Sequence, residues 1–219
     1  MIAYGGYLYE NASQSDIRNK LKEYTKLVAD SISILLNKGT RIPRKVSIST
    51  ILQYAGVETP VDLRDIVIEF SGDSRGYSYT NGPNIIQLPS EILTTKRMSK
   101  NNYIGLSHEL AHHFQHKFGN AHDEGTYTNP EQRGSRKAYV NDRDEINAML
   151  DQIAVYISSN EAFADEVGSY DFGPFVETVI SKILYEQDPT DYLDNQLSDD
   201  NRTKVLEFLY FIWKKIKST

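Results

Sequence analysis

The chain contains no cysteine among its 219 residues. Disulfides and thiolate metal ligands are therefore excluded, so a bound metal would be held by histidine, aspartate, glutamate or tyrosine. Long apolar runs are missing too, because no window approaches the roughly 20 apolar residues of a membrane span. The first residues lack the basic region and apolar core of a secretory signal. These absences predict a soluble, cytoplasmic protein with no membrane partner.

Basic segments are also scarce. Lysine and arginine together number 24 against 30 aspartates and glutamates, which gives a net charge of -6. A nucleic-acid-binding surface needs a cationic footprint for the phosphates, and only the short segment 96–100 is locally basic. The sequence therefore predicts no nucleic-acid partner, and no pattern in it indicates an oligomeric state.

Apolar residues follow two different periodicities along the chain. Helical spacing predicts helices over residues 14–37, 102–118, 142–159, 174–187 and 198–217. The segment 45–86 is rich in β-branched and turn residues instead, with the clearest strands at 65–70 and 84–88. Residues 119–138 are polar and rich in glycine, asparagine and proline, which is typical of a long loop.

The order of these segments predicts an α+β fold. We expect a small antiparallel or mixed sheet packed on the helix over 102–118, with additional helices toward the C-terminus. The expected organisation is one domain over residues 1–219, with a catalytic core at 84–157 and a C-terminal helical part at 160–219.

All five histidines lie between positions 108 and 122. His108 and His112 are four residues apart, so a helix places both on one face, where two imidazoles can bind one zinc ion. Glu109 lies about 60° from His112 around that helix, at roughly 100° per residue. This position suits a general base for zinc-activated water. Gly105 lies on the same polar face, where we expect it to leave room beside the metal.

A catalytic zinc site needs a third protein ligand and an open position. The extended pattern that adds a glycine and a third histidine on the same helix is absent. Glu145 is the preferred candidate, because the small Ala148 shares its helix face and lets that helix approach the motif closely. His122 is the second candidate and Asp144 the third.

The two segments that carry these candidates resemble a known family. His108-Glu109-Leu110-Ala111-His112-His113-Phe114-Gln115, and after the loop Tyr139 with Glu145-Ile146-Asn147-Ala148, resemble the zincin metallopeptidases of the gluzincin-like kind. The resemblance covers about residues 84–157. It implies Zn²⁺ as cofactor, His108, His112 and Glu145 as metal ligands, and Glu109 as catalytic base. It also implies a strand along the active-site cleft, for which Asn84–Leu88 is our candidate.

One position departs from the family pattern. Thermolysin-like enzymes place an aspartate four residues after the third ligand, where it orients a histidine, whereas Met149 stands there in this chain. The orienting side chain must come from elsewhere, and Gln152 and Asp151 are our candidates.

These observations predict a zinc-dependent metallopeptidase that hydrolyses a peptide or protein substrate. Glu109 would take a proton from water and pass it to the leaving amine. The candidate donors to the transition state are Tyr127, Tyr139 and Arg143. The substrate would bind as an extended strand along the edge formed by Asn84–Leu88.

Two other interpretations remain open from sequence. The first is a non-catalytic zinc-binding scaffold in which His116 or His122 provides a fourth protein ligand. Glu109 argues against it, because a structural site has no use for a base beside the metal. The second is a partner-recognition protein that uses segment 163–175 and Trp213.

Overall fold

The computed structural model describes residues 12–71, 77–80, 83–118 and 136–218. It shows a mixed α+β fold, largely helical, with one four-stranded sheet among these residues. The helices are α1 (Ala12–Asn37), α2 (Ile48–Ala55), α3 (Glu91–Thr95), α4 (Lys100–Lys117), α5 (Arg136–Val140), α6 (Arg143–Ser159), α7 (Glu161–Gly168), α8 (Phe172–Ile183), α9 (Pro189–Asp191) and α10 (Asp199–Lys217), with the short turns η1 (Val61–Leu63) and η3 (Tyr192–Gln196).

The sheet is mixed, with strands in the order β1-β2-β4-β3. Its strands are β1 (Lys45–Ser47), β2 (Val67–Ser71), β3 (Ser78–Thr80) and β4 (Ile85–Pro89). The central pair β2 and β4 is parallel, whereas β1 and β3 pair antiparallel with their neighbours. Because β4 is hydrogen-bonded on both sides, it offers no free edge. The predicted substrate-binding edge at Asn84–Leu88 is therefore wrong, and the edge strand beside it is β3.

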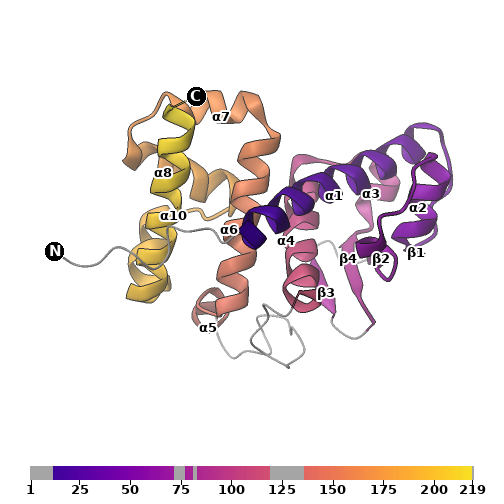
Figure 1. The fold of residues 1–219 in the computed structure, drawn as a ribbon, viewed down its shortest axis with the longest axis horizontal. Coiled ribbons are helices and arrows are strands. Elements are labelled where there is room, and N and C mark those ends of the chain that lie inside the picture. Colours follow the sequence, from indigo (N-terminus) through magenta and orange to yellow (C-terminus); the bar gives the residue numbers. More distant parts are fainter. Residues whose placement is uncertain (1–11, 72–76, 81–82, 119–135, 219) are drawn as a thin grey trace.

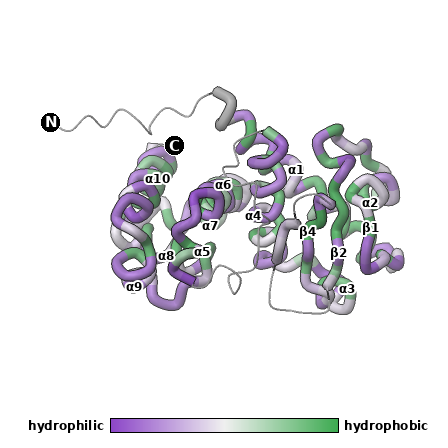
Figure 2. Tube along the Cα trace, turned by 90° about the horizontal axis from the view of Figure 1, so that it is seen from below, coloured by the Kyte–Doolittle hydropathy of each residue, from purple (hydrophilic) through white to green (hydrophobic). Residues whose placement is uncertain are grey.

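Helices α4 and α6 lie side by side in the middle of the molecule, as two perpendicular views agree (Figures 1 and 2). The sheet, α2 and α3 lie on one side of this pair, and α7, α8 and α10 lie on the other (Figure 1). α1 packs on both α4 and α6 and extends from them over the sheet side. Each side has its own cluster of buried apolar side chains. The α4–α6 contact therefore lies where two hydrophobic cores meet.

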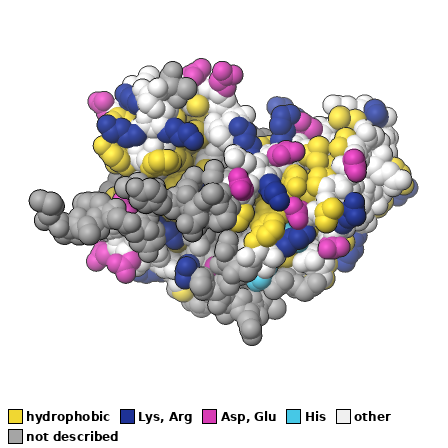
Figure 3. All heavy atoms as spheres, in the orientation of Figure 1, with side chains coloured by type: hydrophobic (Ala, Val, Ile, Leu, Met, Phe, Trp, Pro, Cys, Tyr) yellow, Lys and Arg dark blue, Asp and Glu magenta, His cyan; other side chains and the backbone are white. Residues whose placement is uncertain are grey.

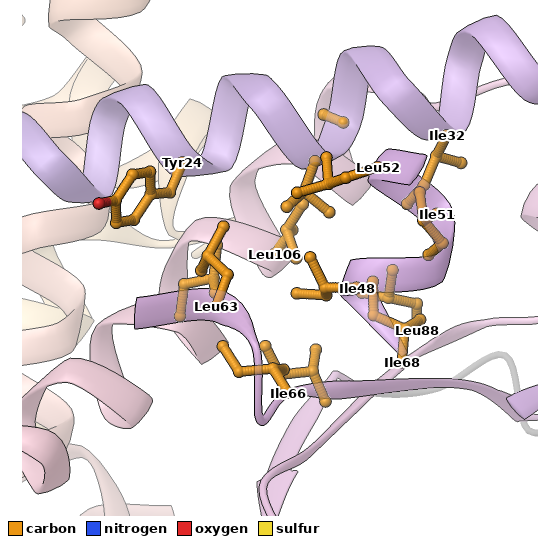
Figure 4. Packing of buried hydrophobic residues seen from close by; sticks show 14 of the residues in the cluster. Tyr24, Ile32, Ile48, Ile51, Leu52, Leu63, Ile66, Ile68, Leu88 and Leu106 are labelled. Atoms are coloured by element: carbon orange, nitrogen blue, oxygen red, sulfur yellow. The ribbon is translucent and has the colours of Figure 1, made fainter. Parts of the chain in front are cut away.

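The sheet-side core is formed where α1 crosses over α2 and the strands. Tyr24 and Ile32 of α1 point toward side chains of α2, η1, the two central strands and α4 (Figure 4). Ile48, Leu52 and Leu106 in this core have no exposed surface. Burial of each such side chain stabilises the fold by about 1.5–3 kcal/mol. This packing fixes the back of α4 and leaves its other face toward α6.

Helix α2 begins inside a segment that we expected to belong to the sheet. The β-branched residues of 45–51 suggest strand, yet only Lys45–Ser47 is strand. Ser47 caps the helix, because its Oγ accepts a hydrogen bond from the Thr50 backbone N–H at 3.0 Å. Ile48 and Ile51 are then three residues apart on one buried helical face, so cap and burial outweigh β propensity.

The five helices predicted from apolar periodicity are present, with shifted ends. α8 covers Phe172–Ile183 rather than 174–187. α4 covers Lys100–Lys117 rather than 102–118. The short helices α3 and α7 were not predicted, because five and eight residues carry too little periodic signal.

The surface carries charges of both signs. Figure 3 shows acidic and basic side chains interspersed over one face of the molecule. Pairs such as Lys26–Asp30, with an Nζ–Oδ2 distance of 2.6 Å, connect them locally. Among the described residues, none of the helices is both long and apolar enough to cross a bilayer.

Candidate metal centre

Helix α4 presents the His-Glu-Leu-Ala-His motif from a well-defined start. Ser99 and Asn102 form a reciprocal capping box, in which Ser99 Oγ accepts from the Asn102 backbone N–H at 3.2 Å and Asn102 Oδ1 accepts from the Ser99 N–H at 2.7 Å. Leu106 and Leu110 on the back of the helix have no exposed surface. Cap and packing together fix the rotation of the helix about its axis, which directs His108 and His112 toward α6.

Helix α6 brings the third member of the group. Asp142 is its N-cap, and its carboxylate accepts from the backbone N–H groups of Asp144 and Glu145 at 2.9 and 3.4 Å. Glu145 therefore lies in the first turn, directly opposite α4. Ala148, one turn later, has no exposed surface, as expected if a small side chain allows the two helices to approach closely.

Three side-chain atoms converge between the helices. His108 Nε2 lies 3.1 Å from His112 Nε2 and 3.3 Å from Glu145 Oε2, and His112 Nε2 lies 3.5 Å from the same Oε2. Within the described ranges, these residues form the group of histidine and carboxylate ligands able to hold a metal ion. The predicted third ligand Glu145 is thus brought together with both histidines.

Two glutamines determine which histidine nitrogens face the group. Gln152 Nε2 donates to the Ile183 carbonyl at 3.1 Å, so its Oε1 faces His108 Nδ1 at 2.9 Å. Gln115 Nε2 donates to the Asp144 carbonyl at 3.3 Å, so its Oε1 faces His112 Nδ1 at 3.3 Å. Because an amide oxygen only accepts, each Nδ1 carries the proton. Both Nε2 atoms then direct their lone pairs into the group.

The distances match the requirements of a tetrahedral ion. Ligand atoms about 2.0–2.1 Å from such an ion are separated by about 3.3–3.4 Å along the tetrahedron edges. The three observed separations of 3.1, 3.3 and 3.5 Å bracket this value. Two neutral imidazoles and one carboxylate are also a ligand set suited to a divalent ion. The residues present therefore fit a metal ion.

The electrostatics of the group favour a positive charge at its centre. Burial lowers the pKa of His108, but the hydrogen bond to Glu145 and the charges of Glu109 and Glu145 outweigh burial and raise the pKa to about 9. Burial raises the pKa of Glu145, but its hydrogen bonds with His108 and His112 outweigh burial and lower the pKa well below its usual range. A proton or a metal cation supplies that charge, and the two compete for the same lone pairs.

Glu109 follows His108 on α4 and is buried. Burial raises its pKa, and the Glu145 carboxylate adds to the rise while His108 and His112 oppose it. Its charge also contributes to the raised pKa of Tyr77, for which burial is the main cause. Glu109 is therefore close enough to the candidate ligands and to Tyr77, which precedes β3, to interact electrostatically with both.

The space beside Gly105 is filled rather than open. A Cβ atom at position 105 would overlap the ring of Tyr77, and the Tyr77 hydroxyl accepts from Asn102 Nδ2 at 3.0 Å. The expectation that Gly105 leaves room beside the metal is therefore wrong. The glycine instead allows Tyr77 to pack directly on α4.

The other two histidines of α4 lie near Tyr79 of β3. His113 Nε2 donates to the Asp62 carbonyl at 3.3 Å, and its Nδ1 lies 3.2 Å from the Tyr79 hydroxyl. Burial lowers the pKa of His113 to about 4, so the ring is neutral. The ring centroid of His116 lies 6.0 Å from that of Tyr79. His113 thus lies on the sheet side of α4, whereas His116 is also close enough to Asp144 of α6 for that carboxylate to oppose the lowering of its pKa by burial.

The remaining predicted site residues divide into three kinds. His122 and Tyr127 lie outside the described residues. Tyr139 lines a pocket together with His108 and Glu145, whereas Arg143 is exposed and is not part of that lining. The other two candidates are acidic residues of α6. Asp151 pairs with Arg18 of α1 at 2.7 Å instead of reaching a histidine, and the Asp144 side chain is not part of the metal-binding group.

The pocket beside the group has a volume of about 160 Å³. Its lining comes from α4, α5, α6, the end of α8, the segment after α8 and η3: His108, Tyr139, Val140, Glu145, Ile146, Met149, Gln152, Ile183, Leu184, Tyr185, Glu186 and Tyr192. The part after α6 was not expected from the sequence. A larger pocket of about 350 Å³ lies between the C-terminal end of α1 and α3, and no candidate site residue lines it.

Comparisons with protein-family models, curated proteins and solved structures found no match to this chain. The functional assignment therefore depends on the sequence motif and on the geometry of the α4–α6 group.

Proposed function

We propose that this protein is a zinc-dependent metallopeptidase with a minimal zincin-like fold. The observation that carries the proposal is the convergence of His108 Nε2, His112 Nε2 and Glu145 Oε2 at tetrahedral spacing, with Glu109 buried beside them. Zinc is the proposed ion because histidine and carboxylate ligands at three corners of a tetrahedron are characteristic of catalytic zinc sites. When bound there, zinc would act as a Lewis acid toward water and the substrate carbonyl.

Glu109 is the proton carrier in this proposal. Its carboxylate takes one proton from the attacking water as the new carbon–oxygen bond forms, and returns it to the amine nitrogen as the carbon–nitrogen bond breaks. Burial raises the pKa of Glu109, which makes it a stronger base than an exposed glutamate. Among the candidate donors to the transition state, Tyr139 lines the pocket that His108 and Glu145 also line.

The substrate-binding edge is revised from β4 to β3. Among the described residues, β3 pairs with β4 and with no other strand, and its Tyr79 contacts the α4 histidine His113. An extended peptide on the outer edge of β3 would run along α4 and form backbone hydrogen bonds in the manner of an added strand. Peptide substrates would thus approach Glu109 from the sheet side.

The test is Glu109→Gln, which preserves shape but removes the base. Zinc content should stay at the wild-type level, while hydrolysis of an internally quenched peptide library should fall by about 10²–10⁴-fold. Glu207→Gln on α10 is the matched control and should change neither quantity. Full activity in the Glu109→Gln variant, or no hydrolysis by the zinc-loaded wild-type protein, would contradict the proposal.

A further inference from the structure

The four residues from the end of α8 onward form one wall of the pocket beside the metal-binding group. Ile183, Leu184, Tyr185 and Glu186, here called the 183–186 segment, all line it. The same pocket is lined by His108 and Glu145, two of the three residues of the group. A side chain that fills the pocket therefore lies against the candidate metal ligands.

This segment is anchored to three different helices around the site. The Ile183 carbonyl accepts from Gln152 of α6 at 3.1 Å, and the Tyr185 hydroxyl donates to Asn101 Oδ1 of α4 at 2.6 Å. Glu186 forms an ion pair with Arg136 of α5. Because Gln152 also contacts His108 Nδ1, the wall is connected to the group through a single side chain.

The backbone of the wall adopts an unusual conformation. Tyr185 has a φ of +58°, in the left-handed region that bulky residues rarely occupy. Such conformations persist where the surroundings over-determine them, and they concentrate at binding and catalytic sites. The conformation ends α8 and turns the chain so that Leu184, Tyr185 and Glu186 all face the pocket.

The lining selects for an apolar occupant. Val140, Ile146, Met149, Ile183 and Leu184 contribute apolar surface. The carboxylates of Glu145 and Glu186 are already engaged, by the two histidines and by Arg136 respectively. A charged substrate side chain would lose its hydration there without gaining an unpaired opposite charge.

We propose that the 183–186 segment is the specificity wall of the site and that the pocket receives an uncharged, apolar substrate side chain next to the bond to be cleaved. This inference rests on the proposed function. The C-terminal helical part, residues 160–219, would thus have a role in substrate selection, because its helix α8 leads directly into the 183–186 segment.

The experiment measures binding of amino-acid hydroxamates to the zinc-loaded protein, because these probes chelate a metal and need no hydrolysis. Leucine and phenylalanine hydroxamates should bind at least about tenfold more tightly than alanine, glutamate or lysine hydroxamates. Leu184→Trp fills the pocket from a half-buried position and should bring this ratio close to one. Leu206→Trp is the matched control, since Leu206 is half-buried in the same helical half away from the pocket, and should retain the preference.

Equal binding of all five hydroxamates, absence of binding by any of them, or an apolar preference that survives in Leu184→Trp would overturn the specificity wall. An apolar preference abolished by Leu184→Trp would support it even if no peptide were hydrolysed. In that last case the peptidase proposal fails and the apolar pocket stands, so the two failures are distinguishable.

Discussion

The neighbouring histidines His112 and His113 lie on two different sides of α4 and have different kinds of partner. His112 faces α6, where its Nε2 lies close to the Nε2 of His108 and to a carboxylate oxygen of Glu145. His113 faces the sheet, where a backbone carbonyl and a tyrosine hydroxyl lie within hydrogen-bond reach of its two nitrogens. Both are buried, with 3% and 4% of their surface exposed. Burial therefore does not distinguish a candidate ligand from a structural histidine, whereas the chemistry of the partners does.

The largest effect is expected from Glu145→Ala on the α6 side. Loss of an outer hydrogen bond to a ligand lowers metal affinity by about 10–100-fold, so loss of the third ligand itself should lower zinc affinity by more than about 100-fold. Competition with a chromophoric chelator measures this affinity, and Glu207→Ala is the control. Wild-type affinity in Glu145→Ala would remove Glu145 from the site.

His113→Ala should give the opposite pattern. It deletes a buried ring and both of its contacts, which should lower the free energy of unfolding by about 2–4 kcal/mol. Urea unfolding in the presence of a chelator measures that loss. Zinc affinity of the folded variant should remain at the wild-type value. A loss of zinc affinity as large as that expected for Glu145→Ala would show that the sheet side of α4 also contributes to metal binding.

Gln152 allows a finer test of the α6 side, because it touches His108 only through Nδ1. Gln152→Leu should lower zinc affinity by about 10–100-fold, whereas Gln152→Glu retains an acceptor and should restore most of it. The same chelator competition applies. If the leucine variant bound zinc as tightly as the wild type, the glutamine would be a packing residue.

The smallest effect is expected from Gly105→Ala on the sheet side. Alanine favours helix by up to about 1 kcal/mol, but its Cβ would displace the Tyr77 ring, at a cost of about 1–3 kcal/mol. The net loss should be about 1 kcal/mol in urea unfolding. In the double variant with Tyr77→Ala, the Gly105→Ala substitution should no longer lower the free energy of unfolding. If Gly105→Ala alone were more stable than the wild type, the packing described for Tyr77 would be contradicted.

Features that depend on helical phase were predictable from sequence. His108 and His112 share a face by spacing alone, and the phase of the next helix places Glu145 and Gln152 on one side of it. The N-caps of α4 and α6 fix where each helix begins, and this determines which of its residues face the other helix. Helical periodicity thus made Glu145 the preferred third ligand, while the choice over His122 and Asp144 depended on the placement of α6 against α4.

Features that depend on contacts between distant segments were not predictable. The strand order places β4 inside the sheet, which no local pattern indicates, and the ring of Tyr77 reaches Gly105 from a separate element. The 183–186 segment meets Gln152 and Asn101 across 31 and 84 residues of chain. Such contacts arise from the packing of two cores rather than from the segments themselves.

X-ray absorption spectroscopy of the zinc-loaded protein tests the central claim most directly. We expect one zinc ion per chain, bound by two histidine nitrogens and one carboxylate oxygen, with a water oxygen completing the tetrahedron. These protein ligands are His108, His112 and Glu145. Failure to bind zinc, or a spectrum with four protein ligands and no open position, would contradict a catalytic metal centre between α4 and α6.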